Sequence, residues 1–297
     1  MKVKTSASRR LFLVFNYLLL TLLSLSFLIP FCIVISSSLV GNLERNVRGS
    51  FVLLPHSPEL TAYRMLLTGN TSVFRAYSNT LYIVVVGTAL SLLVTAMLGY
   101  GLTKKSMPGR NLFVTLIFIT MIFGGGMIPT YLLVDALHLI DTRWSFILPG
   151  LVSAWNTFLM RNFFAAIPQS LEESAVLDGA TPITVFIRII LPLSKAVIAV
   201  IGMYYAVGYW NSWFPGVMYI NNPDLLPMQN VMRNILAVNS AADVNMQIME
   251  DLDALKRPPM EGLRMAAIVV GTLPILVVYP FIQKYFVKGV MIGSIKG

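Results

Sequence analysis

Long stretches without a charged residue divide this chain. Six runs of at least 17 residues contain no Asp, Glu, Lys or Arg. A charge is costly at the bilayer centre, and a spanning helix needs about 20 apolar residues. The runs lack the strict polar–apolar alternation of barrel strands. We therefore expect an all-α polytopic membrane protein with six transmembrane helices, at about 11–40, 76–103, 111–134, 144–164, 196–220 and 265–283.

The charged residues lie unevenly on the two sides of these spans. If the N-terminus is inside, the inner segments hold 13 basic and three acidic residues, and the outer segments have a net charge of −1. Lys and Arg concentrate on the cytoplasmic side of membrane proteins. We therefore expect both termini in the cytoplasm and a first span that is not cleaved as a signal peptide. The total charge of +9 needs no nucleic-acid partner to explain it.

The composition excludes several classes of protein. The chain is 56% hydrophobic and 12% charged, too few charges for the surface of a soluble domain of 297 residues. Its single cysteine excludes a disulfide framework. It has no phosphate-binding loop, no metal-ligand cluster and no nucleophile–base spacing. We expect no catalytic residue, no metal and no cofactor on this chain, which is therefore not predicted to be an enzyme.

The inner segment between the fourth and fifth predicted spans has the signals of a short helix. It reads RNFFAAIPQSLEESAVLDGATPITVFIRIILPLSK. Ser170 and Glu173 have the spacing of a capping box, which predicts a helix at about 171–178. Gly179 can take the left-handed conformation that ends such a helix.

A second short helix follows that glycine. Thr181 is placed to cap it, with Pro182 at its first position, and Pro192 is placed to break it before the fifth span. Most connections take 4–6 residues, whereas this one spends about 30 on two structured helices. We interpret the segment as an element that docks another protein.

This loop resembles the EAA loop of ABC-importer permeases. The family pattern is E-A-A-x3-G-x9-I-x-L-P, from which only Ser174 departs. The surrounding LDGATPITVFIRIILPLSK is similar to the carbohydrate-uptake, maltose-permease-like branch. The segments GRNLFVTLIFITMIFGGGMIPTYLLVDALHLIDTRWSFILPG, YAVGYWNSWFPGVMYI and QKYFVKGVMIGSIKG resemble the LplC/YtcP-type subgroup. The second permease subunit of the bacterial alginate importer is similar to that subgroup.

The resemblance implies a single permease domain over 1–297, with the ABC type I importer permease fold. The first helix of the loop at 168–193 would be a coupling helix seated in a cytoplasmic ATPase, which binds the ATP and Mg. The residues that the resemblance places at this contact are Glu172, Glu173, Ser174, Ala175, Asp178, Gly179 and Pro192. A basic tail would also contact the ATPase, through Gly293, Ser294 and Lys296.

The same resemblance implies the partners and the location. The partners are a second homologous permease subunit, an ATPase dimer and an extracytoplasmic solute-binding protein, which the outer segment 224–264 would contact. The protein would lie among lipid in the bacterial cytoplasmic (inner) membrane and import an oligosaccharide, with an acidic, alginate-like one left open. The alternatives are an ABC permease for another solute and an ion-coupled secondary carrier. The spans hold no carboxylate for a coupling ion, which lowers the second alternative without excluding it.

Aromatic and amide side chains in the fourth and fifth spans are the candidates for the substrate path. Aromatic rings pack on sugar faces, and amides bond to sugar hydroxyls. Aromatic residues in spanning helices also form interfacial belts, so the two asparagines are the better candidates. The candidate residues are Trp155, Asn156, Tyr204, Tyr205, Trp210, Asn211 and Trp213.

Overall fold

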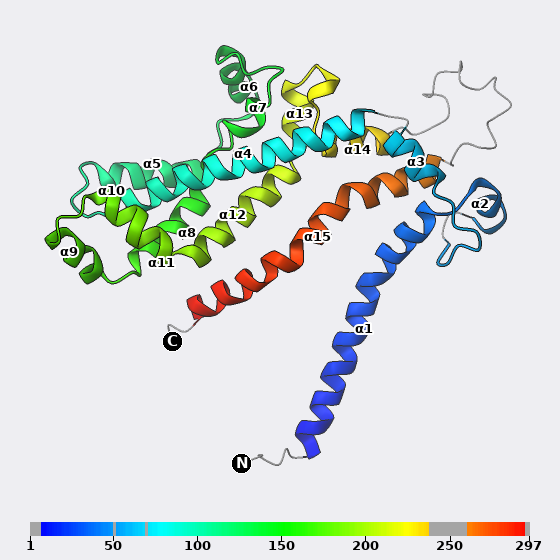
Figure 1. The fold of residues 1–297 in the computed structure, drawn as a ribbon, viewed down its shortest axis with the longest axis horizontal. Coiled ribbons are helices and arrows are strands. Elements are labelled where there is room, and N and C mark those ends of the chain that lie inside the picture. Colours follow the sequence, from blue (N-terminus) through cyan, green and yellow to red (C-terminus); the bar gives the residue numbers. More distant parts are fainter. Residues whose placement is uncertain (1–6, 50–51, 69–70, 238–259, 295–297) are drawn as a thin grey trace. The chain divides into compact units, whose positions relative to one another are not determined.

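The computed structural model describes residues 7–49, 52–68, 71–237 and 260–294 (Figure 1). Within these ranges the structure is helical, and its one recorded β-bridge pairs Val40 with Pro58. The chain forms two compact units, which we describe one at a time. Unit 1 comprises Met1–Thr71 and Met232–Leu273, and unit 2 comprises Ser72–Val231 and Pro274–Gly297.

Among its described residues, unit 1 contains three helices of its own and parts of two others. They are α1 (Ala7–Ser38), α2 (Asn42–Arg48), α3 (Thr61–Thr68), the end of α14 (Met228–Ala237) and the first part of α15 (Met260–Ser294). Ala62 and Leu66 of α3 pack against Ala266 and Ala267 of α15. The buried Arg45 guanidinium donates to the Glu261 carboxylate and to the Ser37 carbonyl, both at 2.7 Å. These contacts join α1, α2 and α15 within the unit.

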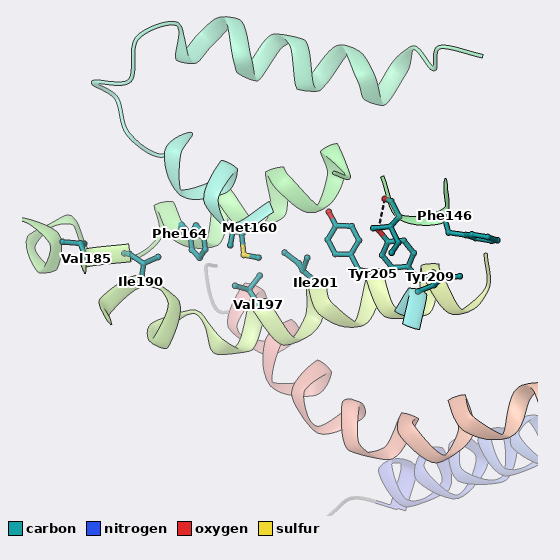
Figure 2. Packing of buried hydrophobic residues seen from close by; sticks show 12 residues of the cluster. Phe146, Met160, Phe164, Val185, Ile190, Val197, Ile201, Tyr205 and Tyr209 are labelled. Atoms are coloured by element: carbon teal, nitrogen blue, oxygen red, sulfur yellow. Dashed lines mark hydrogen bonds between the residues drawn. The ribbon is translucent and has the colours of Figure 1, made fainter. Parts of the chain in front are cut away.

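Unit 2 is built around α4 and α12 (Figure 1). Its elements are α4 (Thr71–Gly101), α5 (Arg110–Ile122), α6 (Met127–Ala136), α7 (Trp144–Ile147), α8 (Ala154–Ala165), α9 (Gln169–Leu177), α10 (Pro182–Val185), a π-helical turn (Phe186–Ile190), α11 (Leu191–Leu193), α12 (Lys195–Trp210), α13 (Phe214–Tyr219) and a 3-10 turn (Pro223–Leu225). Its core includes Met160 and Phe164 of α8 with Val197 and Ile201 of α12 (Figure 2). A continuous apolar layer therefore joins α8 to α12.

Two helices among the described residues are individually long and apolar enough to span a membrane, Ser8–Ser38 and Val73–Gly101. They correspond to the first two predicted spans. Two further pairs of helices pass the same test together, but each pair is bent. Part of α15 lies outside the residues whose side chains are described, so the sixth predicted span stays a prediction.

The third predicted span is broken, which corrects the expectation of one helix over 111–134. The chain bends by 118° between α5 and α6. Gly126 has φ 84° and ψ 163°, a conformation that essentially only glycine adopts. The 13 residues of α5 alone extend about 20 Å, short of the roughly 30 Å of a bilayer core.

The fourth predicted span, 144–164, is also not one helix. The four residues of α7 end at Ile147, and α8 begins only at Ala154. Pro149 lies between them and lacks the N–H that a continuing helix would need, and Gly150 follows it. The expectation of a single continuous helix is therefore wrong here. A charge-free apolar run does not show where the helical backbone hydrogen bonds are interrupted.

The path into the fifth predicted span contains the expected break. Helical structure continues from Pro182 to Leu193 and then bends by 83° into α12. The bend lies at Ser194, two residues after the exposed Pro192. The Phe186 carbonyl accepts from the Leu191 N–H, five residues on, in a π-helical turn just before that proline.

Gly87 allows α4 and α12 to approach closely. A Cβ atom built on Gly87 would lie 2.8 Å from two carbons of the Tyr209 ring. That ring is 8% exposed, and its hydroxyl lies 2.9 Å from the Ser91 hydroxyl, so it has little room to move. Small residues commonly permit such approaches between membrane helices.

We predict that Gly87→Ala destabilises the protein although alanine has the higher helix propensity. Overpacking at this contact should lower the free energy of unfolding by about 1–3 kcal/mol. The measurement is the midpoint of thermal unfolding in detergent. Gly101→Ala is the matched control on the same helix, because its Cβ would meet nothing within 4 Å. A midpoint for Gly87→Ala equal to or above that of the control would contradict the close approach.

Candidate functional site

A cavity of about 410 Å³ lies beside the interruption between α7 and α8. Ligand cavities are typically concave, mostly apolar and furnished with a few polar groups. None of the described residues that line this one is charged. Its principal side chains come from α7, α8, α12 and α13, and they are Phe146, Asn156, Tyr204, Tyr205, Tyr209 and Tyr219.

Tyr205 and Tyr209 join the interrupted segment to α4. The Tyr205 hydroxyl lies 2.7 Å from the Thr95 hydroxyl and accepts from the Ser153 N–H at 3.0 Å. The Tyr209 hydroxyl donates to the Ile147 carbonyl at 3.4 Å, as the dashed line in Figure 2 marks. Each tyrosine therefore satisfies a backbone group at one side of the break.

Ser153 caps the helix that resumes after the break. Its side-chain oxygen accepts from the Asn156 N–H at 3.3 Å while its own N–H donates to Tyr205. Free backbone groups at membrane depth are tolerated only where protein or water satisfies them. The polar contacts of Tyr205, Tyr209 and Ser153 thus allow a non-helical segment to line the cavity.

The predicted substrate-path residues fall into three groups. Asn156, Tyr204 and Tyr205 line this cavity. Trp155 is 64% exposed and lines a second cavity of about 740 Å³, together with residues of α5. The remaining candidates, which line neither cavity, are Trp210, Asn211 and Trp213.

Sequence reasoning missed Phe146 and Tyr219 as cavity residues. Phe146 belongs to the fourth predicted span, so its aromatic ring alone could have suggested it. Tyr219 falls within the fifth predicted span, 196–220, but the expectation of one helix there is wrong, because α12 ends at Trp210 and a separate helix, α13, carries Tyr219. No sequence pattern signals that the chain returns to the cavity after this interruption.

The loop at 168–193 has the predicted sequence of helix, glycine turn and helix. Gly179 has φ 83°, and the next N–H, of Ala180, donates to the Ala175 carbonyl at 2.9 Å. The Thr181 hydroxyl caps α10 by accepting from the Thr184 N–H at 3.3 Å. These local features confirm the predicted Thr181 cap and the predicted glycine turn.

The predicted capping box is wrong. The helix α9 begins at Gln169, and Ser170 makes no cap bond. The Pro168 carbonyl accepts from the Leu171 N–H at 3.2 Å, so the first turn closes on Pro168 and includes Ser170. A residue inside the first turn has helical dihedral angles and no longer occupies the cap position.

The two adjacent glutamates of α9 have different surroundings. Glu172 is 20% exposed and forms an ion pair with Lys104, whereas Glu173 is exposed. Burial is the largest single influence and disfavours the charge of Lys104, but the interactions with Glu172 and Tyr100 together outweigh it and raise the pKa of the lysine. Ala175 packs on the core of unit 2. The other predicted contact residues of the loop are exposed, namely Ser174, Asp178, Gly179 and Pro192.

The predicted tail contact falls mainly outside the described structure. The helix α15 extends through Gly293 and Ser294. The surroundings of these two residues are not described, and Lys296 lies wholly outside the described residues. The tail contact therefore stays a prediction.

Comparison with known proteins gives concordant matches. The family described as "Binding-protein-dependent transport system inner membrane component" matches residues 5–292. The polygalacturonan/rhamnogalacturonan transport system permease protein YtcP of Bacillus subtilis is 39% identical over 288 residues, covering 97% of this chain and 99% of that protein. Protein LplC of the same organism is 42% identical over 288 residues, covering 97% and 96%.

A solved structure agrees with these relatives. It is the crystal structure of a bacterial ABC transporter involved in the import of the acidic polysaccharide alginate. One of its chains matches with a TM-score of 0.85 and 30% identity, covering 96% of this chain and all of that chain.

We predict that Tyr205→Phe destabilises the protein by about 1–3 kcal/mol, because it leaves the Ser153 N–H and the buried Thr95 hydroxyl without their partner. Tyr204→Phe is the matched control: Tyr204 lines the same cavity, is 41% exposed and has no recorded hydrogen bond from its hydroxyl in the described structure. Thermal unfolding midpoints in detergent compare the two variants. Equal midpoints would show that the Tyr205 hydroxyl does not support the break.

Proposed function

Because the chain belongs to the family of binding-protein-dependent transport system inner membrane components, we propose that it is a permease subunit of an ATP-driven importer for an acidic oligosaccharide. The observation that carries the proposal is the full-length likeness to two carriers of acidic sugars. One relative is named for polygalacturonan and rhamnogalacturonan transport, and one matching structure comes from an alginate importer. Galacturonan and alginate both carry carboxylates on their sugar rings.

The proposed topology has six spans with both termini in the cytoplasm of a bacterium, in its inner membrane. The helices α1 and α4 and the two bent pairs support four of these spans. The third and fifth would be bent or broken spans, and the fourth would combine α7 and α8 across the cavity. The excess of basic residues in the inner segments supports the orientation.

The helix α9 is proposed to dock on a cytoplasmic ATPase dimer, which binds ATP and Mg. Its surface supports this role, because Leu177 is 88% exposed and Val176 is 57% exposed. Glu173 and Asp178 are also exposed and give this apolar surface a charged rim. Apolar side chains with a polar rim are typical of a protein–protein contact. The ATPase would carry out the hydrolysis, and this chain would contribute no catalytic residue.

The cavity beside the α7–α8 break is proposed as part of the wall of the substrate path. Tyr204 offers a partly exposed ring to a sugar face, and Asn156 offers an amide for hydroxyl groups. No charged side chain faces the cavity among its described lining residues, so this wall would contact the rings and hydroxyls rather than the carboxylates. A second homologous permease would supply the opposite wall, and a solute-binding protein would deliver the oligosaccharide to the outer segments.

Uptake by the purified complex tests the proposal. The tagged chain, isolated from its native membrane with its partners, is placed in proteoliposomes with the binding protein. We expect ATP-dependent uptake of labelled oligogalacturonides that exceeds the uptake of neutral malto-oligosaccharides of equal length. Uptake that survives without ATP and collapses with the ion gradient would instead establish a secondary carrier. Equal uptake of both sugars would contradict the proposal that the substrate is an acidic oligosaccharide.

Gly179 gives a prediction for the docking helix. Its φ of 83° strains any residue with a Cβ, most of all a β-branched one, although a Cβ would meet nothing within 4 Å. We expect Gly179→Val to lower the recovery of the ATPase with the tagged chain, or to abolish uptake. Gly179→Asn should retain most of both, because asparagine tolerates this conformation although it also has a Cβ. Normal uptake by Gly179→Val would contradict the proposed role of the turn.

A further inference from the structure

The cytoplasmic end of α4 is tied directly to α9. We propose that Lys104 is a positioning residue that fixes the docking helix to α4, so that motion of α9 reaches α4 as well as α12. The inference rests on the proposed function, since it assumes that an ATPase moves α9. It assigns a role to an ion pair between residues 68 positions apart in the chain.

The ion pair is partly shielded from solvent. The Lys104 side chain is 33% exposed and that of Glu172 is 20% exposed. Glu172 lies in the first turn of α9, where the helix dipole also favours a negative charge. Partial burial and the helix dipole both favour this ion pair. It therefore holds its geometry better than an exposed pair of flexible side chains.

Lys104 also rests on an aromatic cluster that joins three elements. Its ammonium lies 4.2 Å from the centre of the Tyr100 ring, at the end of α4. That ring is stacked on Phe186 of the π-helical turn, with centroids 5.0 Å apart, and Phe164 of α8 meets both rings edge-on. Lys104 thus links α9 to the aromatic cluster of Tyr100, Phe164 and Phe186.

The loop that carries Lys104 is fastened to α4. The Lys104 N–H donates to the Gly101 carbonyl at 3.1 Å, and the Thr103 N–H donates to the Tyr100 carbonyl at 3.0 Å. Leu102 is 1% exposed, and its carbonyl accepts from the Arg110 side chain at 2.9 Å. A displacement of Lys104 would therefore move the end of α4 rather than a loose loop.

The other contacts of α4 explain why this connection matters. Ser91 and Thr95 of α4 hold the Tyr209 and Tyr205 hydroxyls at the cavity. A contiguous set of contacts within unit 2 thus runs from Glu172 through Lys104 and α4 to the cavity wall. The ion pair adds a direct route through α4 to the routes through the chain connections of α9 to α8 and α10.

The test replaces Lys104 in the intact complex. Lys104→Met keeps the length of the side chain and removes its charge. We expect the ratio of oligogalacturonide taken up to ATP hydrolysed to fall at least about fivefold, with ATPase recovery and the KM for ATP unchanged. Lys104→Arg should retain the ratio, and Lys105→Met is the control because Lys105 is the exposed neighbour with the same charge.

A charge exchange separates positioning from folding. Lys104→Glu should lower the ratio, and combining it with Glu172→Lys should restore it in part, because the reversed pair keeps the mutual attraction but loses the favourable helix dipole and the contact of the ammonium with Tyr100. If the double variant assembles with the ATPase yet stays at the low ratio, the inference is overturned. An unchanged ratio in Lys104→Met also overturns it, while ATP-dependent uptake by the wild-type complex leaves the proposed function standing. If the wild-type chain recovers no ATPase, both proposals fail together.

Discussion

Every backbone N–H and C=O group inside a bilayer must find its hydrogen-bond partner within the protein or in trapped water. A continuous helix without proline meets this requirement by itself, as α4 does over its whole apolar length. The chain between α7 and α8 does not. There the Tyr205 and Tyr209 hydroxyls replace helical partners for the Ser153 N–H and the Ile147 carbonyl. The cavity exists because these substitutes allow the helix to stop.

The same requirement explains why α4 is central to unit 2. The two tyrosines can serve the broken segment only if their own hydroxyls are held, and Ser91 and Thr95 hold them from one face of α4. Gly87, on the same helix, leaves room for the Tyr209 ring. A single straight helix thus supports a neighbouring segment that is not helical. Substrate chemistry and conformational transmission, as proposed, would then depend on one element.

Features encoded locally could be predicted from the sequence. Charge-free runs predicted α1 and α4, the Gly179 turn followed from one glycine, and the resemblance to ABC-importer permeases is confirmed by the family match over residues 5–292. Features that depend on distant partners could not be predicted. The break near Pro149 is sustained by tyrosines about 55 residues later in the chain, and Lys104 meets Glu172 across four intervening helices. Even the start of α9 depended on which carbonyl closed its first turn, which residue preferences do not decide.

The adjacent acids of α9 show how one short helix can address two surfaces. Successive residues on a helix point about 100° apart, so Glu172 turns toward Lys104 while Glu173 faces outward. The two glutamates therefore have different contacts because of their positions around the helix axis, not because of their residue type. Removing one residue from the turn between α8 and α9 would rotate the helix by one such step and bring Glu173 to the place of Glu172, whereas adding one residue would bring Leu171 there. The composition and charge of the loop would scarcely change in either case. The length of that turn is thus as much a part of the docking element as the motif itself.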